Sequence, residues 1–170
     1  AQCPGMGGRR TTRVLARNAV RGLEADEFLR LSPEALREEY GLPAEVAAAV
    51  LDRSRLDEAR RLQDRLEGLG VRLVTAADAH YPDRVERFDP DHPGLLFLYG
   101  NLSLLERQTF AVLASRGTPP AGVDLIEKLT EDAVLAGEIP VSGHDRPEYQ
   151  RAALVPLRWG TPRILVFDRG

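Results

Sequence analysis

The chain contains few of the residues that mark disulfide-bonded, metal-binding or membrane proteins. Cys3 is the only cysteine among 170 residues, so neither a disulfide framework nor a cysteine metal cluster is expected, and we interpret Cys3 as incidental. No apolar run approaches the roughly 18 residues of a membrane-spanning helix, and the first residues lack the basic and then apolar order of a signal peptide. We therefore expect a cytoplasmic protein without a membrane partner.

Lysine is also scarce, because Lys128 is the only one and arginine carries the remaining positive charge. Arginine suits bidentate contact with phosphate, although a biased genomic base composition would have the same effect. The formal net charge of −3 argues against a protein coated in basic surface. The charge is uneven, however. Residues 1–23 contain no carboxylate and five arginines, of which all but the second recur every four residues and would form one stripe on a helix: Arg9, Arg10, Arg13, Arg17 and Arg21.

The remaining composition, 43% hydrophobic and 29% charged residues, is typical of a globular protein with a real core. Residues 1–70 predict a helical domain. A glycine turn at residues 4–8 precedes a helix to residue 23, whose expected apolar face is Leu15, Ala16, Ala19, Val20 and Leu23. A short helix follows at residues 26–31. Ser32 and Pro33 then begin a helix that ends at Gly41, and residues 43–69 continue the helical period with a possible break near residues 52–54, up to Gly70.

The glycine turn resembles half of a helix-hairpin-helix or SAM-like module. In a helix-hairpin-helix hairpin, backbone amides at the helix start meet DNA phosphates. A plain helix start explains the same residues equally well. The possible DNA contacts of this domain are Gly5, Gly7, Arg9, Arg10, Arg13 and Arg17.

Residues 71–170 predict an α/β domain. Short apolar strands are expected at residues 71–75, 95–99, 110–114, 139–142 and 163–167, with a loop at residues 76–93 and helices at residues 123–137 and 148–158, the second ended or kinked by Pro156. Strands that alternate with helices indicate a parallel sheet with right-handed crossovers. Ligands bind such sheets at the carboxyl ends of the strands, which directs attention to the end of the strand at residues 110–114.

Three motifs in this half resemble the DprA/Smf family of DNA-processing proteins. The first is Tyr81-Pro82-Asp83-Arg84-Val85, and the second is Pro93-Gly94-Leu95-Leu96-Phe97-Leu98-Tyr99-Gly100-Asn101-Leu102. The third, Ala111-Val112-Leu113-Ala114-Ser115-Arg116, is followed by Gly122 at the spacing of the last glycine of the family motif. The match continues through Ser142-Gly143 and Ala152-Ala153-Leu154 to residues 164–167. A helical domain ahead of a Rossmann-like domain also agrees.

The resemblance implies a non-enzymatic protein without a cofactor that binds single-stranded DNA and helps to load a RecA-type recombinase during natural transformation. The family uses a basic pocket around its third motif, and the resemblance carries Ser115, Arg116, Gly117 and Gly122 over to that loop, and Ser142 and Gly143 to the start of the second loop. A guanidinium beside backbone amides at a helix start also suits a phosphate on physical grounds. The implied DNA or phosphate contacts are Ser115, Arg116, Gly117, Gly122, Ser142, Gly143, Arg146 and Arg151.

The chain departs from the family pattern in several places. Ala114 stands where the family has glycine, Pro119 and Ala121 replace hydroxyl and aromatic residues, and the later "SG.A.GID..AH" motif is reduced to residues 142–146. The sequence ends after the third strand of the Rossmann-like domain, as in a fragment or a shortened relative lacking the C-terminal part. An open edge strand favours a homodimer or a covering segment.

Two other functions remain open from sequence alone. One is a protein-binding adaptor on a degenerate Rossmann-like scaffold. The other is a nucleotide-binding or nucleotide-hydrolysing relative, although the "PGG.GT..E" run of phosphoribohydrolases does not occur in this sequence. His144, Asp145 and Arg146 would be its acid and base candidates, but adjacent polar loop residues are more often solvated. His80 and His92 lack metal-ligand spacing, and we interpret both as loop histidines.

Overall fold

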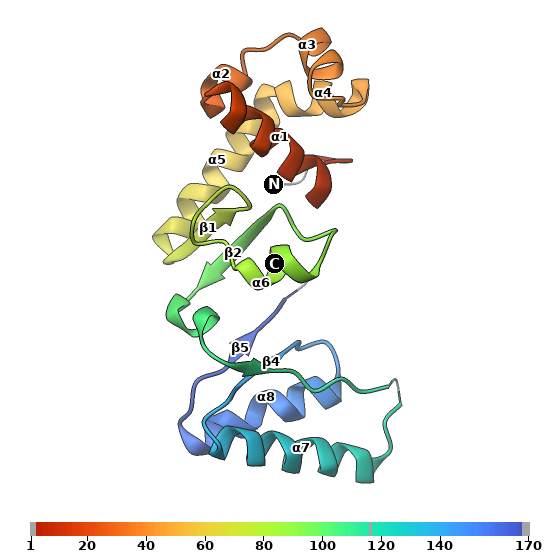
Figure 1. Cartoon of the computed structure of the whole chain (residues 1–170), viewed down its shortest axis with the longest axis vertical. Helices are drawn as coiled ribbons and strands as arrows, with labels where there is room; N and C mark the ends of the chain where they lie inside the picture. Colours follow the sequence, from red (N-terminus) through yellow and green to blue (C-terminus); the bar gives the residue numbers. More distant parts are fainter. Residues whose placement is uncertain (1–2, 116, 168–170) are drawn as a thin grey trace. The chain divides into compact units, whose positions relative to one another are not determined.

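The computed structural model describes residues 3–115 and 117–167, and internal contacts divide the chain into two compact units, Ala1–Gly100 and Asn101–Gly170 (Figure 1). The predicted domain boundary near Gly70 falls where helices give way to strands. The internal contacts, however, place the strands at residues 71–75 and 95–99 in the same unit as the preceding helices. No helix within the described ranges is long and apolar enough to cross a bilayer.

The described part of the first unit begins with a series of helices, and the starts of two of them follow directly from local side-chain chemistry. Ser32 Oγ accepts a hydrogen bond from the Ala35 amide at 3.1 Å, and Asp52 Oδ1 accepts one from the Ser54 amide at 2.9 Å. Both contacts satisfy amides that a helix start leaves free. The predicted start at Ser32 and the break at residues 52–54 are confirmed. The helices are α1 (Gly8–Arg21), α2 (Ala25–Phe28), α3 (Pro33–Glu38), α4 (Ala44–Leu51) and α5 (Arg53–Gly68).

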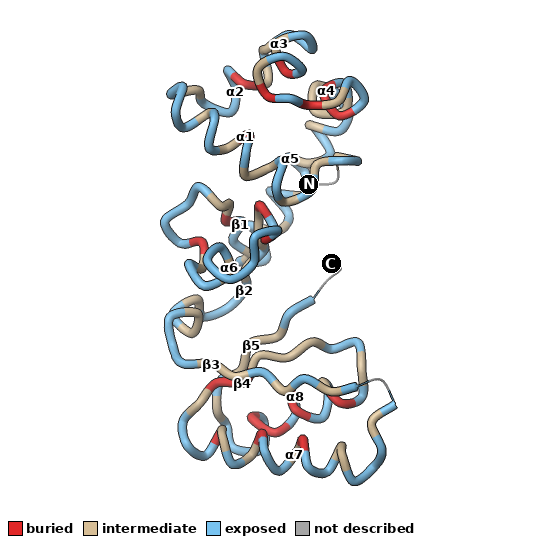
Figure 2. Tube along the Cα trace, turned by 45° about the vertical axis from the view of Figure 1, so that its right-hand side comes forward, coloured by how far each residue is buried: buried red, intermediate tan, exposed pale blue. Residues whose placement is uncertain are grey.

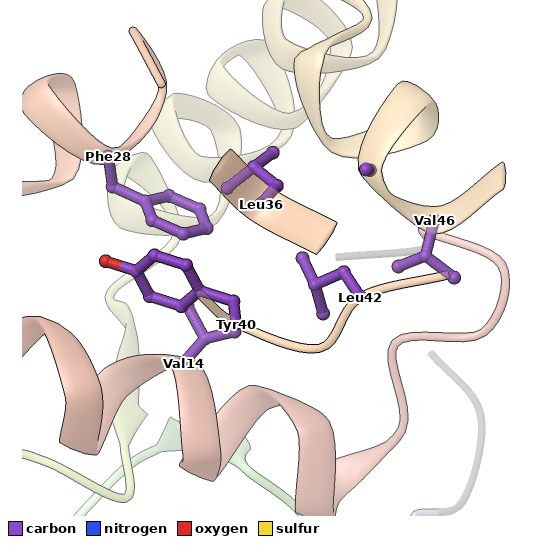
Figure 3. Close-up of a cluster of buried hydrophobic side chains, with 7 residues drawn as sticks. Val14, Phe28, Leu36, Tyr40, Leu42 and Val46 are labelled. Carbon is purple, nitrogen blue, oxygen red and sulfur yellow. The ribbon is translucent and has the colours of Figure 1, made fainter. Parts of the chain in front are cut away.

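A small hydrophobic core holds α1, α2, α3 and α4 together (Figure 3). At its centre the Tyr40 ring meets the edge of Phe28, with 5.0 Å between centroids, and its hydroxyl donates to Asn18 Oδ1 at 2.7 Å. The guanidinium groups of Arg17 and Arg21 lie 5.7 and 5.9 Å from the same ring. The core therefore contains a satisfied polar group among apolar residues, which are Val14, Phe28, Leu36, Tyr40, Leu42, Val46 and Ala47.

The predicted apolar face of α1 is wrong. Val14 is the buried residue of this helix, whereas Val20 is 88% exposed. The helix is fixed by Val14 and by Asn18, one turn further on, because both face Tyr40 and the core. The error arose because an asparagine was not counted as an inward residue, although its amide has a buried hydroxyl as partner.

The strands β1 (Val71–Thr75) and β2 (Leu95–Tyr99) have the predicted bounds, but they pair antiparallel and not in a parallel sheet. Val71 lies opposite Tyr99, and Thr75 lies opposite Leu95. The connection contains only α6 (Asp83–Phe88), a helix missed by the sequence prediction, which buries no residue and so provides no packed crossover. The prediction that these two strands belong to a parallel sheet is therefore wrong.

Asp78 closes the turn that follows β1, which makes the first unit sensitive to acid. Its Oδ2 accepts from the amide of Thr75 at 2.6 Å and from the hydroxyl of Thr75 at 2.7 Å. These bonds, the backbone one first, lower the pKa of Asp78 below its usual value. A carboxylate with a lowered folded-state pKa stabilises the fold above its unfolded pKa of about 3.9, and this stabilisation is lost as the pH falls through the folded value.

Asp78→Asn is expected to lower the free energy of unfolding by about 1 kcal/mol at pH 7, the net contribution of such exposed hydrogen bonds. The difference between variant and parent should shrink below about pH 4, where the parent loses the same charge. Thermal unfolding recorded across pH measures both effects. Asp64→Asn, an exposed position on α5, is the control, and an equal pH dependence of Asp78→Asn and Asp64→Asn would contradict the assignment.

The second unit is the parallel α/β part of the chain. After the 3₁₀ helix η1 (Leu102–Glu106), the strands β3 (Thr109–Phe110), β4 (Ile139–Ser142) and β5 (Ile164–Leu165) pair in the order β3-β4-β5, all parallel. The helices α7 (Pro120–Leu135) and α8 (Pro147–Trp159) pack against β4 and against each other. Their facing sides hold most of the buried residues of this unit (Figure 2). The predicted Rossmann-like arrangement of parallel strands and helices is confirmed.

Two details of the second unit differ from the prediction. The expected strands at residues 110–114 and 163–167 are each reduced to two paired residues. Pro156 lies inside α8 without ending it, and the helix continues to Trp159 before Gly160 closes it at a φ of 61°. A left-handed glycine at this position is a common helix end.

Candidate nucleic-acid interface

The loops that follow β3 and β4 lie at one edge of the three-stranded sheet, because parallel strands place their carboxyl ends together. Residues 111–119 lead from β3 into α7, and residues 143–146 lead from β4 into α8. Each loop is followed by a helix start, but Pro120 and Pro147 at the first helical positions carry no amide hydrogen, and the Gly122 amide donates to the carbonyl of Pro119 at 2.8 Å. The first turn of α7 contains no acidic residue, so nothing there compensates the positive end of the helix.

The first loop contains three of the predicted contacts and the first turn of α7 contains a fourth, Gly122, and the backbone explains two glycines. Gly117 has a φ of +72°, a conformation that residues with a side chain rarely adopt. A Cβ at Gly122 would come within 2.6 Å of Thr118 Cγ2, while the Thr118 hydroxyl donates to the carbonyl of Ser115 at 2.8 Å. Ser115 is exposed. Arg116, the predicted phosphate ligand, lies outside the described residues.

The second loop is packed around a small residue and a stacked arginine. The Ser142 carbonyl accepts the amide of Val166 at 2.9 Å, which uses Ser142 in strand pairing. A Cβ at Gly143 would lie 3.3 Å from the ring of Tyr149, so the ring covers this turn. Arg146 places its guanidinium 5.4 Å from the centroid of the same ring, and its Nε is 3.9 Å from the Asp145 carboxylate. Arg146 therefore presents a cation at the sheet edge that is only loosely paired.

Arg151 belongs to a different network. Its Nε lies 3.2 Å from Glu127 Oε2 on α7, and Arg158 pairs with the same carboxylate. Arg146 is the extended residue that caps the start of α8, and its partners are Tyr149 and Asp145, whereas Arg151 lies within the helix and pairs with Glu127. The two arginines therefore belong to separate networks, and the charge of Arg151 is compensated.

Four of the six predicted contacts of the helical domain meet at one place, and Gly5 and Arg17 do not belong to it. A pocket at the start of α1 is lined by Gly7, Arg9, Arg10 and Arg13, together with Gly8, Gly41 and Asp91. Arg9 Nε pairs with Asp91 Oδ1 at 3.0 Å, and Arg10 donates to the carbonyl of Gly5 at 2.5 Å. Arg13 is exposed and forms neither a hydrogen bond nor an ion pair within the described ranges.

The rest of the arginine stripe is used inside the first unit. Arg17 and Arg21 lie over Tyr40, and Arg21 also pairs with Glu39. Gly8 approaches the backbone of the segment at residues 92–94 so closely that a Cβ would overlap the carbonyl of His92. Gly8, the first residue of α1, is therefore required by packing, whereas a Cβ at Gly7 would meet nothing.

The remaining titratable residues indicate structural roles. His92 is buried, and its Nδ1 lies 3.2 Å from the hydroxyl of Tyr81, whose pKa is raised by burial. Burial also raises the pKa of the Cys3 thiol, which disfavours the reactive thiolate. Among residues 3–115 and 117–167 no group of three or more His, Cys, Asp or Glu side chains could hold a metal ion.

Sequence reasoning missed two aromatic side chains at the sheet edge. Tyr149 lies under Arg146, and Phe167 lies against His144 with 4.6 Å between ring centroids. From the sequence, His144 is expected only as an acid or base candidate, and Tyr149 and Phe167 only as parts of a helix and a strand. Their positions just after β4 and β5 could have identified them, because strand ends are where this fold binds ligands.

The comparisons with known proteins agree with this geometry. Residues 72–146 match the family model described as DNA recombination-mediator protein A. Among solved structures, DNA processing protein A (DprA) from Streptococcus pneumoniae has a similar fold, with a TM-score of 0.72 and 23% sequence identity over 95% of this chain. The aligned part is 53% of that protein, so the chain spans about half of its length. No curated protein matches. The resemblance to the DprA/Smf family indicated by the three motifs is confirmed, through a family match over residues 72–146 and a DprA-like fold over nearly the whole chain.

Proposed function

We propose that the chain binds single-stranded DNA at the carboxyl edge of the β3-β4-β5 sheet and acts as a recombination mediator that helps to load a RecA-type recombinase. The observation that carries the proposal is the convergence of the two loops at this edge, each at a helix start, with Arg146 beside them. Backbone amides and a guanidinium are suitable donors for phosphate oxygens. The matched family is itself described as a recombination mediator.

The proposed contacts lie on two surfaces. On the sheet edge, Arg146 is the described residue that would supply charge to a phosphate, and Arg116, which lies outside the described residues, joins it from the sequence motif. Arg151 is the member of this set whose charge is compensated, by Glu127. The sheet-edge set is Ser115, Arg116, Gly117, Gly122, Ser142, Gly143, Arg146 and Arg151, and the second set is the pocket at the start of α1 with Gly5 and Arg17.

A binding role is supported over hydrolysis by the position of His144. Its ring packs against Phe167, and within the described ranges no hydrogen bond joins it to Asp145, which lies beside Arg146 instead. A general base needs an orienting partner and a substrate within hydrogen-bond reach. We therefore propose that the chain acts without catalysing a reaction.

Arg146→Ala tests the DNA site. Affinity for a fluorescent oligothymidylate, measured by anisotropy between about 50 and 200 mM salt, should fall with salt for the parent protein. Arg146→Ala is expected to weaken binding about tenfold at the low-salt end and to reduce the slope of log K against log salt by about 0.7, the value for one phosphate contact on a single strand.

Arg107→Ala is the matched control, because Arg107 is exposed in the same unit but precedes β3 and so belongs to the opposite edge of the sheet. It removes the same charge and should leave the slope nearly unchanged. If the two substitutions lower the affinity and the salt slope equally, DNA binding depends only on the net charge of the protein. No binding by the parent protein at low salt would refute the proposed function.

A protein-binding adaptor is the second candidate, favoured by exposed leucines on the two helices of the second unit. Leu125 and Leu129 on α7 are 55% and 51% exposed, and Leu154 and Leu157 on α8 are 48% and 57% exposed. Such apolar side chains are common at interfaces between proteins. Light scattering across protein concentrations tests a homodimer, and pull-down with a purified RecA-type recombinase, with and without single-stranded DNA, tests the loading partner.

A further inference from the structure

The sheet edge also carries an exposed pair of rings that phosphate binding does not require. His144 lies in the loop after β4, Phe167 follows β5, and their ring centroids are 4.6 Å apart at an interplanar angle of 51°. Phe167 remains 56% exposed and His144 is also exposed. The pair therefore presents ring surface to solvent and is not part of the core.

His144, one member of the pair, is held in place by a hydrogen bond to its backbone. Gln150 Nε2 donates to the carbonyl of His144 at 2.8 Å and so fixes the loop to the first turns of α8. The same loop carries Arg146, whose guanidinium lies over the ring of Tyr149. One short segment thus presents aromatic rings and a cation within a few residues of each other, at the edge where the strand ends meet.

Rings and cations in this combination match the chemistry of an unpaired nucleotide. A nucleobase offers a flat π surface that stacks on aromatic side chains, at about 1–3 kcal/mol per base, while the adjoining phosphate takes a charge-assisted hydrogen bond from arginine. Bases in a duplex are already stacked on each other and leave no free face. A site with both features therefore favours single strands over duplexes.

We propose that His144 and Phe167 form a stacking platform for one nucleobase of a single strand, with Arg146 on the neighbouring phosphate. This inference rests on the proposed function, since it assigns the bases to a surface of the same DNA site. It further assigns a role to two residues that contact no phosphate, and it makes affinity depend on the presence of bases and not on charge alone.

The test compares two oligonucleotides of equal length, an oligothymidylate and its abasic analogue, in the same low-salt anisotropy assay. The parent protein should bind the oligothymidylate at least tenfold more tightly, because both carry the same phosphates and only one carries bases. Phe167→Leu, which keeps an apolar side chain but removes the ring, should lose about tenfold in affinity for the oligothymidylate and leave the abasic strand unaffected. His144→Ala should act in the same direction, and Phe167→Trp should retain base-dependent binding.

Circular dichroism and thermal unfolding of each variant show whether it is folded, and quenching of a 2-aminopurine placed in the oligonucleotide reports stacking directly. Equal affinity of the parent protein for the two strands would overturn the stacking platform while leaving DNA binding intact. A Phe167→Leu variant that still quenches 2-aminopurine and binds like the parent would have the same consequence. Loss of affinity for both strands by the folded Phe167→Leu variant would also overturn it. A parent protein that binds neither strand refutes the proposed function itself.

Discussion

Leu36→Ala is expected to lower the free energy of unfolding by about 2–5 kcal/mol, the range for removing a fully buried leucine side chain. Leu36 has no exposed surface, and it lies in the small cluster that joins α1 to α4 (Figure 3). A cluster of this size cannot easily close over the cavity, because its neighbours are held by the Phe28 and Tyr40 rings. Such a loss is a large fraction of the usual stability of a domain.

Urea denaturation followed by far-ultraviolet circular dichroism measures this loss. Leu69→Ala is the control, because Leu69 belongs to the same unit and is 69% exposed. It removes the same atoms from a position that already contacts water, so we expect a change within about 0.5 kcal/mol. If the two substitutions cost the same, the helical part would not be held by the described core.

These variants also test how much of the fold follows from sequence. Helix ends set by one side chain were predictable, because Ser32 and Asp52 act on amides two or three residues away. The face of α1 was not, since half-buried Asn18 is turned inward by its hydrogen bond with Tyr40, which lies 22 residues further along the chain. Polar residues that point inward have no periodic signature of their own.

The pairing of β1 with β2 was also not predictable from the sequence pattern. The bounds of β1 and β2 follow from their apolar pattern, yet the pattern does not say which strand a neighbour pairs with. Residues 76–94 were long enough for a crossover, and the antiparallel pairing depends on how they close back on the sheet. By contrast, the β3-β4-β5 part was predictable, because α7 and α8 are long helices with clear apolar faces.

At the candidate site, the sequence predicted the positions of the turn glycines, but it did not predict which arginines form ion pairs. Gly117 and Gly122 fall where the motif placed them, and the backbone gives each a steric reason. Arg146 and Arg151 were assigned alike from the sequence, but only the second meets Glu127, which lies 24 residues earlier and on another helix. Ion pairs between elements depend on tertiary packing, so a list of arginines cannot distinguish free charge from compensated charge.

Reversing two charges at the start of α1 is expected to give the largest effect on DNA binding. Arg10→Glu combined with Arg13→Glu replaces two cations of one pocket by carboxylates, next to Asp91. If phosphates occupy this pocket as proposed, each substitution removes a contact and adds repulsion, and affinity for an oligothymidylate at about 50 mM salt should fall about a hundredfold or more. The same anisotropy assay measures it.

The control must carry the same change in net charge, because a more acidic protein repels DNA wherever the charges are placed. Arg30→Glu with Arg61→Glu meets this requirement, since both arginines are exposed, belong to the same unit and line none of the described pockets at α1. A loss confined to the Arg10 and Arg13 pair would locate a phosphate site at the glycine turn. Equal losses in the two double variants would assign the effect to net charge. If neither pair changes affinity while Arg146→Ala does, the sheet edge alone binds DNA, and Gly8 is explained by its close approach to His92.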